Sequence, residues 1–197
     1  MVSSIPKHRA AALALALTLS LSGLAGAQTI AVPPVAVDID NFARVNDAYY
    51  RGAQPEGDDY AALASLGVKT VINLTSDDAQ ADEQLMVEKN GMRYVNIPMS
   101  TRRSPTAKEL DQFLAIVNDE ASQPVYVHCV GGKHRTGVMT AVYRMTRDGI
   151  TGKAAFDEMK QFKYGPDFLH PEFKKFVQTY QVKPAAAVAA ASQQQQQ

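Results

Sequence analysis

The sequence predicts an α/β domain, a central, mostly parallel sheet of about four to five strands flanked by helices. Two patterns support this fold class. Short apolar segments rich in β-branched residues recur along the chain, as is typical of strands buried on both faces. Amphipathic segments with helix start and stop signals separate them. Strands that alternate with helices form parallel sheets, because each crossover helix returns the chain to the same edge.

Four segments are predicted strands. Residues 48–55 (AYYRGAQP) form a short strand that breaks at its glycine and proline. Residues 68–74 (VKTVINL) and 124–129 (PVYVHC) are nearly all apolar, as expected of interior strands. Residues 92–98 (MRYVNIP) form a further strand, which Pro98 closes.

Six segments carry helix signals. The first has Asp58 or Asp59 as its cap and Gly67 as its stop signal. The third begins at Ser104, and its large apolar residues recur at helical spacing. The six predicted helices are residues 57–67, 76–91, 104–119, 135–149, 151–162 and 170–180.

Residues 1–27 are predicted to be a secretory signal peptide. A basic stretch precedes an apolar run, and Ala25-Gly26-Ala27 is a typical cleavage site. The apolar run is shorter than the roughly 20 residues that span a bilayer. We therefore expect an exported protein, periplasmic or secreted, with no stable membrane insertion after cleavage. An uncleaved anchor is the alternative.

The rest of the chain divides into a linker, one domain and a tail. Two prolines favour an extended linker over residues 28–40. Residues 183–197 are rich in alanine and glutamine and have too few large apolar groups to pack, so we expect a disordered tail. Residues 41–182 have the usual size of one domain. We expect this domain to be a monomer.

Charge and cysteine content restrict the function classes. Removal of the signal peptide takes away Lys7 and Arg9, which leaves 18 basic and 20 acidic residues, a balance of −2. Nucleic acid or an anionic membrane would favour a strongly positive chain, so we expect neither as a partner. The single cysteine, Cys129, forms no internal disulfide, so an apolar core has to stabilise the fold.

The glycine-rich loop after the strand 124–129 is the candidate functional site. Cys129 ends this strand, and Arg135 stands six positions later at the start of a helix. Ligands of open α/β sheets bind beyond the carboxyl ends of the strands. A loop that enters a helix there turns backbone N–H groups inward, and the helix dipole adds positive potential. The loop is therefore suited to an anion.

Residue types within the loop agree with this interpretation. Gly131 and Gly132 allow the loop to close tightly around a small anion. The guanidinium of Arg135 can bind two oxygens of one phosphate. The same positive field favours the thiolate form of a cysteine. The loop would both activate Cys129 as a nucleophile and bind its target.

Two other interpretations of Cys129 are weaker. A lone cysteine at a strand end is commonly a buried apolar thiol, but the flanking glycines and arginine do not fit that role. A metal site built from His128, Cys129 and His134 lacks a fourth ligand, and adjacent side chains of a strand point to opposite faces. We expect no metal and no cofactor.

Residues 128–137 (HCVGGKHRTG) match the H-C-x5-R-[ST]-G signature of the cysteine-dependent protein tyrosine and dual-specificity phosphatases. The form GKHRTG most resembles the atypical plant and fungal dual-specificity phosphatases, which include inositol pyrophosphatases. The stretches YYRGAQP, VINL and IPM are similar to that group as well, and the resemblance covers roughly residues 45–180. It implies the fold predicted above, here in a bacterial, exported member of the superfamily.

The resemblance also implies a mechanism. The Cys129 thiolate attacks phosphorus and gives a cysteinyl-phosphate intermediate. Arg135 and the loop amides bind the phosphoryl oxygens, and Thr136 donates a hydrogen bond to the sulfur. His128 fixes the loop, or is a plain structural histidine. The loop residues that contribute amides are Val130, Gly131, Gly132 and Lys133.

The sequence departs from the family pattern at the general acid. The family supplies an aspartate on a loop before the cysteine, but NIPMSTRRSPTAKE has no carboxylate where that loop is expected. His134 is one candidate, because an unperturbed histidine pKa of about 6.5 suits proton donation near neutral pH. Its alternative role is to shape the loop or bind substrate. Asp77, Asp78 and Asp82 are the other candidates.

The same region predicts a basic rim. Arg102 and Arg103 could join Lys133 in binding a multiply phosphorylated substrate, although adjacent surface arginines are often only solvated charges. Lys163 or His170 could contribute as well, but a loop that joins two helices explains them equally.

The sequence therefore predicts a phosphatase that acts through a cysteinyl-phosphate intermediate. The substrate would be a protein phosphorylated on tyrosine, serine or threonine, or an inositol phosphate or phosphoinositide. The alternative is a phosphate-binding module without turnover, which the missing acid makes plausible. Arsenate reduction requires a resolving cysteine, which is absent, and sulfur transfer does not explain the Arg-Thr-Gly sequence at the helix start.

Overall fold

The computed structural model describes residue 1 and residues 37–76 and 79–182. Apart from residue 1, the predicted signal peptide (1–27) lies outside the described residues, as do most of the linker and the predicted tail (183–197). The compact unit formed by residues 34–197 contains all the elements below.

A five-stranded sheet with the order β1-β2-β5-β3-β4 forms the centre of the domain. Its strands are β1 (Ala43–Asn46), β2 (Tyr49–Gly52), β3 (Thr70–Asn73), β4 (Arg93–Asn96) and β5 (Val125–His128). Only β1 runs antiparallel, against β2; the other neighbours are parallel, so the predicted mostly parallel sheet is confirmed. Strand β1 is not among the predicted strands, because its ARVN segment is short and partly exposed at the sheet edge.

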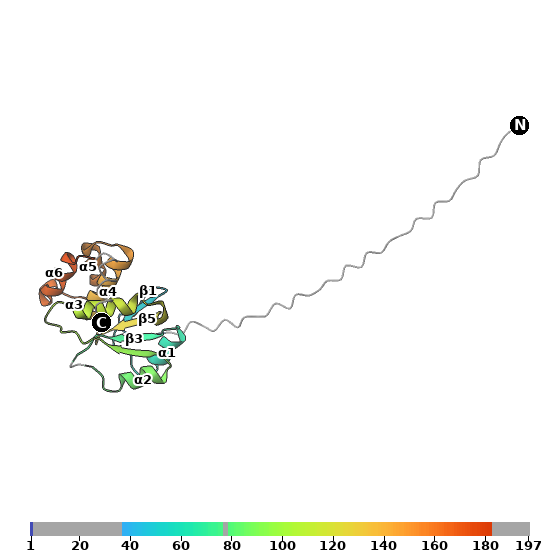
Figure 1. Cartoon of the computed structure of the whole chain (residues 1–197), viewed down its shortest axis with the longest axis horizontal. Helices are drawn as coiled ribbons and strands as arrows, with labels where there is room; N and C mark the ends of the chain where they lie inside the picture. The colour runs from blue at the N-terminus through green and yellow to red at the C-terminus, as the bar shows by residue number, and fades with distance from the viewer. Residues whose placement is uncertain (2–36, 77–78, 183–197) are drawn as a thin grey trace, which may run out of the picture. The chain divides into compact units, whose positions relative to one another are not determined.

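The helices cover both faces of the sheet. They are α1 (Asp59–Ser65), α2 (Glu83–Lys89), α3 (Ala107–Val117), α4 (Arg135–Asp148), α5 (Gly152–Gln161) and α6 (Pro171–Thr179), with short 3-10 turns η1 (Glu120–Ser122) and η2 (Asp167–Leu169). Figure 1 shows α1 and α2 on one side of the sheet and α3 to α6 on the other. The flanked α/β architecture is therefore confirmed as well.

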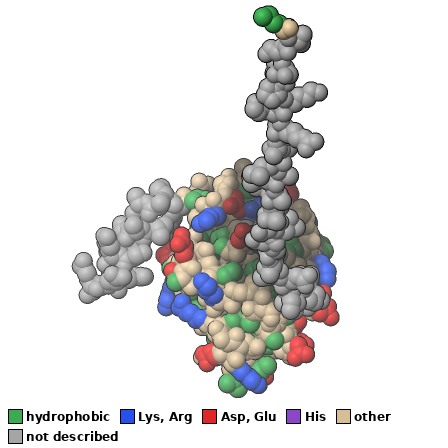
Figure 2. Space-filling view, turned by 90° about the vertical axis from the view of Figure 1, so that its right-hand side faces the viewer, with side chains coloured by type: hydrophobic (Ala, Val, Ile, Leu, Met, Phe, Trp, Pro, Cys, Tyr) green, Lys and Arg blue, Asp and Glu red, His purple; other side chains and the backbone are tan. Residues whose placement is uncertain are grey.

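Acidic and basic side chains are interspersed on the visible surface of the domain, with no patch of a single sign (Figure 2). None of the described helices has the length and apolar character needed to cross a membrane.

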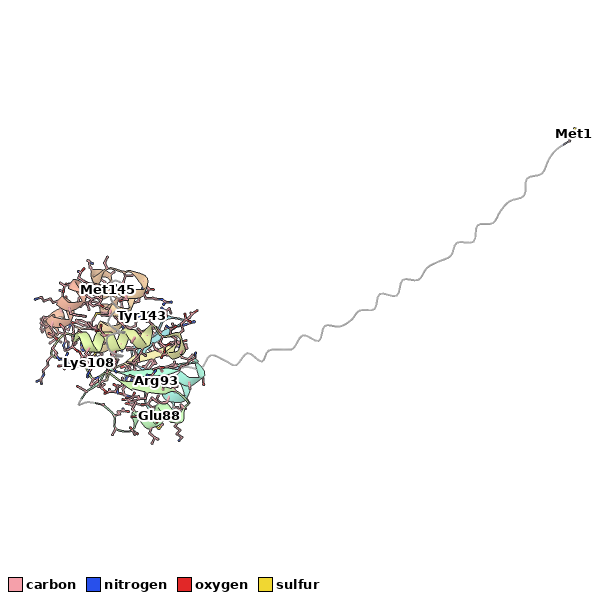
Figure 3. All side chains as sticks on the ribbon, in the orientation of Figure 1. Met1, Glu88, Arg93, Lys108, Tyr143 and Met145 are labelled. Atoms are coloured by element: carbon pink, nitrogen blue, oxygen red, sulfur yellow. The ribbon has the colours of Figure 1, made fainter. Side chains whose placement is uncertain are left out.

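Two apolar cores pack against the two faces of the sheet. One contains the buried side chains of α3 to α6, among them Phe113, Val142 and Phe156, and the other contains those of α1 and α2, among them Leu63 and Val87. Tyr143 and Met145 of α4 and Glu88 of α2 lie on opposite sides of the sheet (Figure 3). These two apolar cores stabilise a domain in which Cys129 forms no disulfide.

The order of the strands explains where a ligand can bind. From β2 the chain passes through α1 to β3 and through α2 to β4, and then returns on the other face, through α3, to insert β5 between β2 and β3. Right-handed crossovers that proceed in opposite directions place their helices on opposite faces. The sheet therefore has a switch point at β5, where the carboxyl ends of parallel strands leave room for a ligand.

Strand β5 is buried along its whole length and delivers Cys129 to that edge. Side chains of a strand alternate between faces. Val127 and Cys129 accordingly belong to the core beneath α3 to α6, whereas Tyr126 belongs to the core beneath α1 and α2.

The structure refines the predicted ends of three segments. Helix α2 begins at Glu83 rather than near residue 76, because the polar segment before it has no apolar face to pack on the sheet. Asp58 occupies the cap position of α1 without a side-chain bond, while Asp59 accepts from the N–H of Glu56 at 2.9 Å. Ile39 is buried in the α1–α2 core, so the end of the predicted linker packs against the domain.

Candidate active site

Three successive backbone carbonyl groups of the loop that follows β5 accept hydrogen bonds from residues outside the loop. The bonds are Gln54 N to Val130 O at 3.1 Å, Asn41 Nδ2 to Gly131 O at 2.7 Å and Arg51 Nη2 to Gly132 O at 2.5 Å. In a trans peptide, each carbonyl points opposite to the next N–H. The N–H groups of residues 131–133 therefore face away from these partners, towards the inside of the loop.

The inner side of this loop is a set of free donors. The backbone N–H groups of residues 130–134 make no hydrogen bond to any other described residue. Unpaired N–H groups that converge in front of a helix form a site for a small anion. Helix α4 follows directly, with its N-terminus at Arg135. An arrangement of this kind suits a small anion.

Gly132 permits the close approach of the loop to β2. Its φ is +63°, a conformation that side chains rarely adopt, and a Cβ there would lie 2.5 Å from the backbone C and O of Gly52. Gly131 is less restricted, since a Cβ would meet only the flexible Lys133 side chain at 3.5 Å. Only Gly132 is therefore required as glycine by both sterics and conformation.

Cys129, Arg135 and Thr136, which flank the loop, are all buried. Cys129 is 3% exposed and Arg135 is 4% exposed, with Arg135 Nη1 donating to the Met99 carbonyl at 3.4 Å. Arg135 thus reaches the loop that follows β4. Thr136 is fully buried, and its Oγ1 has no hydrogen-bond partner among the described residues. The predicted bond from Thr136 to the sulfur is not formed here, which leaves the hydroxyl available as a donor.

His128 faces away from Cys129. Its Nε2 lies 2.7 Å from Glu83 Oε1, both side chains are fully buried, and its ring stacks on Tyr126 at 5.6 Å. Asn73 at the end of β3 also donates to Glu83. These contacts tie β5 to β3 and α2 and do not involve the loop, so they favour the structural role of His128 over the predicted loop contact.

His134 is held by the segment between α5 and α6. Its Nε2 donates to the Tyr164 carbonyl at 2.9 Å, and its ring centre lies 3.9 Å from that of His170. Burial lowers the pKa of His134, and the neighbouring positive charges lower it further, against the Tyr164 bond. A neutral ring then carries its one proton on Nε2, towards the carbonyl. This arrangement favours a loop-shaping role for His134 over proton donation.

The other acid candidates are the aspartates that precede α2 in the sequence. Asp77 and Asp78 fall outside the described residues. Asp82 is exposed and occupies the cap position of α2. In the sequence, all three stand between the end of β3 at Asn73 and the start of α2 at Glu83.

The predicted basic rim is not assembled. Both guanidinium nitrogens of Arg103 bind Glu109, at 2.9 and 2.7 Å, where Glu109 also forms the capping box of α3 with Thr106. Arg102 is exposed, and Lys163 Nζ lies 3.3 Å from Asp40 Oδ1. Among the predicted cations, only Lys133 lines the cavity beside the loop.

That cavity has a volume of about 420 Å³ and is predominantly acidic. Its ionisable lining consists of Asp38, Asp40, Glu56, Asp59 and Lys133, and the rest is Ile39, Ala53, Gln54, Gln80, Val130 and Gly131. Four carboxylates against one ammonium group give this side of the loop a negative balance.

The residues that hold the loop are not among those predicted from the sequence; they are Asn41, Arg51 and Gln54. A signal for Arg51 was present, because a charged residue within the strand AYYRGAQP is unusual for an interior strand. Asn41 and Gln54 lie in loops and carry no comparable signal. Among the described residues, no group of His, Cys, Asp and Glu side chains is arranged to hold a metal ion.

The chain is similar in sequence to known phosphatases. Residues 34–175 match the family model described as DSP-PTPase phosphatase fused to NAD+ kinase. The chain is 28% identical to inositol diphosphatase DSP2 of Oryza sativa over 168 residues, 79% of this chain and 76% of that protein. It is 32% identical to dual specificity protein phosphatase TpbA of Pseudomonas aeruginosa over 127 residues, 64% of this chain but only 56% of that protein.

Solved structures show the same fold. The crystal structure of P. aeruginosa TpbA has a TM-score of 0.63 and 28% identity, covering 81% of this chain and 96% of that one. The catalytic core of the PP-IP phosphatase SIW14 from S. cerevisiae has a TM-score of 0.67 at 23% identity, covering 79% and 94%.

Gly132→Ala should disable the loop without unfolding the domain. A Cβ at position 132 pushes the loop away from β2 and turns the inner N–H groups, and misplacement by about 1 Å can cost about 10²-fold in rate. We expect such a fall in kcat/KM on p-nitrophenyl phosphate. Gly131→Ala is the matched control and should keep most of the activity. Equal losses in the two variants would contradict the account of Gly132.

Acidification should destabilise the domain through His134. Because its pKa is lowered in the folded state, the unfolded state binds more protons, so this contribution is complete above about pH 6.5 and lost as the pH falls below it. The thermal midpoint should fall between about pH 7 and 5, and less steeply in His134→Gln. An unchanged slope in that variant would contradict the assignment.

Proposed function

The chain belongs to the DSP-PTPase family of dual-specificity and tyrosine phosphatases, and from this premise we propose that it hydrolyses phosphate monoesters on proteins. One observation supports the chemistry above all others. The three outward-bound carbonyls turn consecutive N–H groups inward beside a buried cysteine and a helix N-terminus. A phosphoryl group fits such a site because its charge is spread over three oxygens.

Hydrolysis proceeds in two steps. The Cys129 thiolate attacks phosphorus, so that an S–P bond forms while the P–O bond to the leaving group breaks. The inner N–H groups and Arg135 bind the oxygens in the transition state. Water then attacks phosphorus, the S–P bond breaks, and inorganic phosphate and the thiolate are released. Thr136 Oγ1, buried and unpaired among the described residues, donates to the departing sulfur.

A carboxylic acid is the proposed general acid, which protonates the leaving oxygen in the first step. His134 is directed at the Tyr164 carbonyl, which makes it a poor donor. The carboxylates Asp77, Asp78 and Asp82, which follow β3 in the sequence, are the proposed source.

A phosphorylated protein fits the surroundings of the loop better than an inositol polyphosphate does. Additional phosphates would need cations around the site, but Arg103 is bound to Glu109 and the neighbouring cavity carries four carboxylates. Those carboxylates favour a substrate with neutral or basic residues beside the phosphorylated one. Relatives carry both kinds of name, inositol diphosphatase and dual specificity protein phosphatase, so the substrate class has to be tested directly.

We also propose that the protein is exported and acts as a monomer. The proposal of export rests on the features of residues 1–27, and a mature N-terminus at Gln28, found by mass spectrometry after expression in a bacterium, would support it. An intact N-terminus on a membrane-bound protein would favour the uncleaved anchor.

Phosphatase activity should depend on Cys129. The wild-type protein should hydrolyse p-nitrophenyl phosphate, whose good leaving group needs little protonation, and Cys129→Ser should lower kcat by about 10⁴-fold or more. Trapping of a phosphorylated cysteine by rapid acid quenching would identify the intermediate. Tight binding of inorganic phosphate without turnover by the wild type would favour the phosphate-binding module.

The acidic cavity should select among substrates. We expect faster hydrolysis of phosphopeptides with flanking lysines than of inositol hexakisphosphate or phosphopeptides with flanking aspartates. The double variant Asp38→Asn, Glu56→Gln should raise KM for the basic phosphopeptide about fivefold, since each exposed ion pair contributes ~0.2–1 kcal/mol. Added salt should shrink the difference.

Glu120→Gln is the matched control, because Glu120 lies before β5, at the opposite edge of the sheet. Preference for inositol polyphosphates in the wild type would reverse the proposed substrate class while leaving the cysteine chemistry in place.

A further inference from the structure

Arg51 is a buried cation without a carboxylate partner among the described residues. It is 1% exposed, and its side chain contacts the Gly132 carbonyl at 2.5 Å and the ring of Phe162, whose centre is 3.9 Å from the guanidinium carbon. The negative charge of Glu158 raises the pKa of Arg51 slightly from a distance. Both carboxylate oxygens of Glu158 are already bound by Arg144, Oε2 by Nε at 3.1 Å and Oε1 by Nη2 at 2.7 Å. The guanidinium charge is therefore not neutralised by a neighbouring acid.

Burial of such a charge is costly unless an anion compensates for it. A carbonyl and an aromatic ring provide partial compensation. Burial lowers the pKa of Arg51, whereas the nearby Tyr49 and Cys129 raise it. An arginine remains charged under these conditions. The anions that can balance it are those of the catalytic loop, the thiolate and the bound phosphoryl group.

Strand register places Arg51 on the side of Cys129. In the parallel pair of β2 and β5, Arg51 lies opposite Val127 and Gly52 lies opposite His128. Opposite residues of a ladder share a face, and Val127 and Cys129 face the α3–α6 core. Arg51 therefore projects into the layer that contains Cys129 and lies beneath the loop.

The Gly132 carbonyl connects Arg51 to the anion site. Its bond to Arg51 fixes the orientation of the peptide between Gly132 and Lys133. The N–H of Lys133 is thereby turned inward. The charge of a guanidinium is spread over a planar group, so one nitrogen can donate to the carbonyl while the rest of the charge faces the loop. The compact ammonium group of a lysine is less suited to both roles. Arg51 Nε is also buried and unpaired among the described residues.

We propose, resting on the phosphatase function proposed above, that Arg51 is a positioning residue of the catalytic loop. It holds the Gly132 carbonyl so that the Lys133 N–H points at the phosphoryl group, and its charge stabilises the Cys129 thiolate from beneath. It does not contact the substrate. The other ionisable groups near this end of β5 are Arg135 at the start of α4 and Tyr126 on β5, whereas the pair of His128 and Glu83 faces away from Cys129.

The test uses the full chain with Arg51→Met, Arg51→Lys and the control Arg147→Met, which alters an exposed arginine of α4. Cys129 is the only cysteine, so alkylation by iodoacetamide reports one thiol. For each protein, the alkylation rate is measured against pH, kcat/KM is measured on p-nitrophenyl phosphate, and the thermal midpoint is measured by circular dichroism.

Arg51→Met should shift the midpoint of the alkylation curve to higher pH and lower kcat/KM by about 10²-fold, as expected for a misplaced binding group. Arg51→Lys, which keeps the charge but not the fork, should restore the alkylation midpoint and only part of kcat/KM. Arg147→Met should behave as the wild type.

A purely structural role predicts a different pattern. Arg51→Met would then lower only the thermal midpoint, with the alkylation curve and kcat/KM unchanged below that temperature, and this result would overturn the proposal. If Arg51→Met does not fold, an unchanged kcat/KM in Arg51→Lys would overturn the positioning role. A wild type without phosphatase activity would refute the proposed function, while the alkylation curves would still test the role of Arg51.

Discussion

The contact between the catalytic loop and β2 is the constraint on which the site depends. Gly132 approaches Gly52 so closely that no side chain fits between them, and the loop carbonyls are bound by groups at or beside β2. The loop carbonyls are paired with protein donors on the outer side, and the N–H groups on the inner side are left to bind a ligand. The anion site is thus made by the neighbouring strand as much as by the loop itself.

The sheet order makes this contact possible. Insertion of β5 between β2 and β3 buries it on both faces and along both edges, so that the strand that carries Cys129 has little freedom to move. The polar pair of His128 and Glu83 adds a link to α2, since both side chains are fully buried and in contact at 2.7 Å. Cys129 thus follows a constrained strand at the switch point of the sheet.

Sequence patterns predicted the fold class, four of the five strands and all six helices, because buried strands and amphipathic helices have distinct periodicities. They also identified the loop, since Cys129 and Arg135 flank it at a characteristic spacing. Specific contacts between side chains could not be predicted from these patterns. The capture of Arg103 by Glu109, the bond from His134 to Tyr164 and the position of Arg51 beneath Gly132 all join distant or packed groups. Periodicity carries no information about such partners.

The burial of Cys129 has a further consequence for its redox chemistry. A thiolate that is oxidised to a sulfenic acid can be protected as a disulfide only if a second thiol is near. Cys129 has no such neighbour in this sequence, and at 3% exposure it meets the solvent only through the opening of its loop. Return to the thiolate therefore requires an external thiol narrow enough to pass through that opening, while a bond between the sulfur and a backbone nitrogen of the loop would only protect the sulfur until such a thiol reduces it.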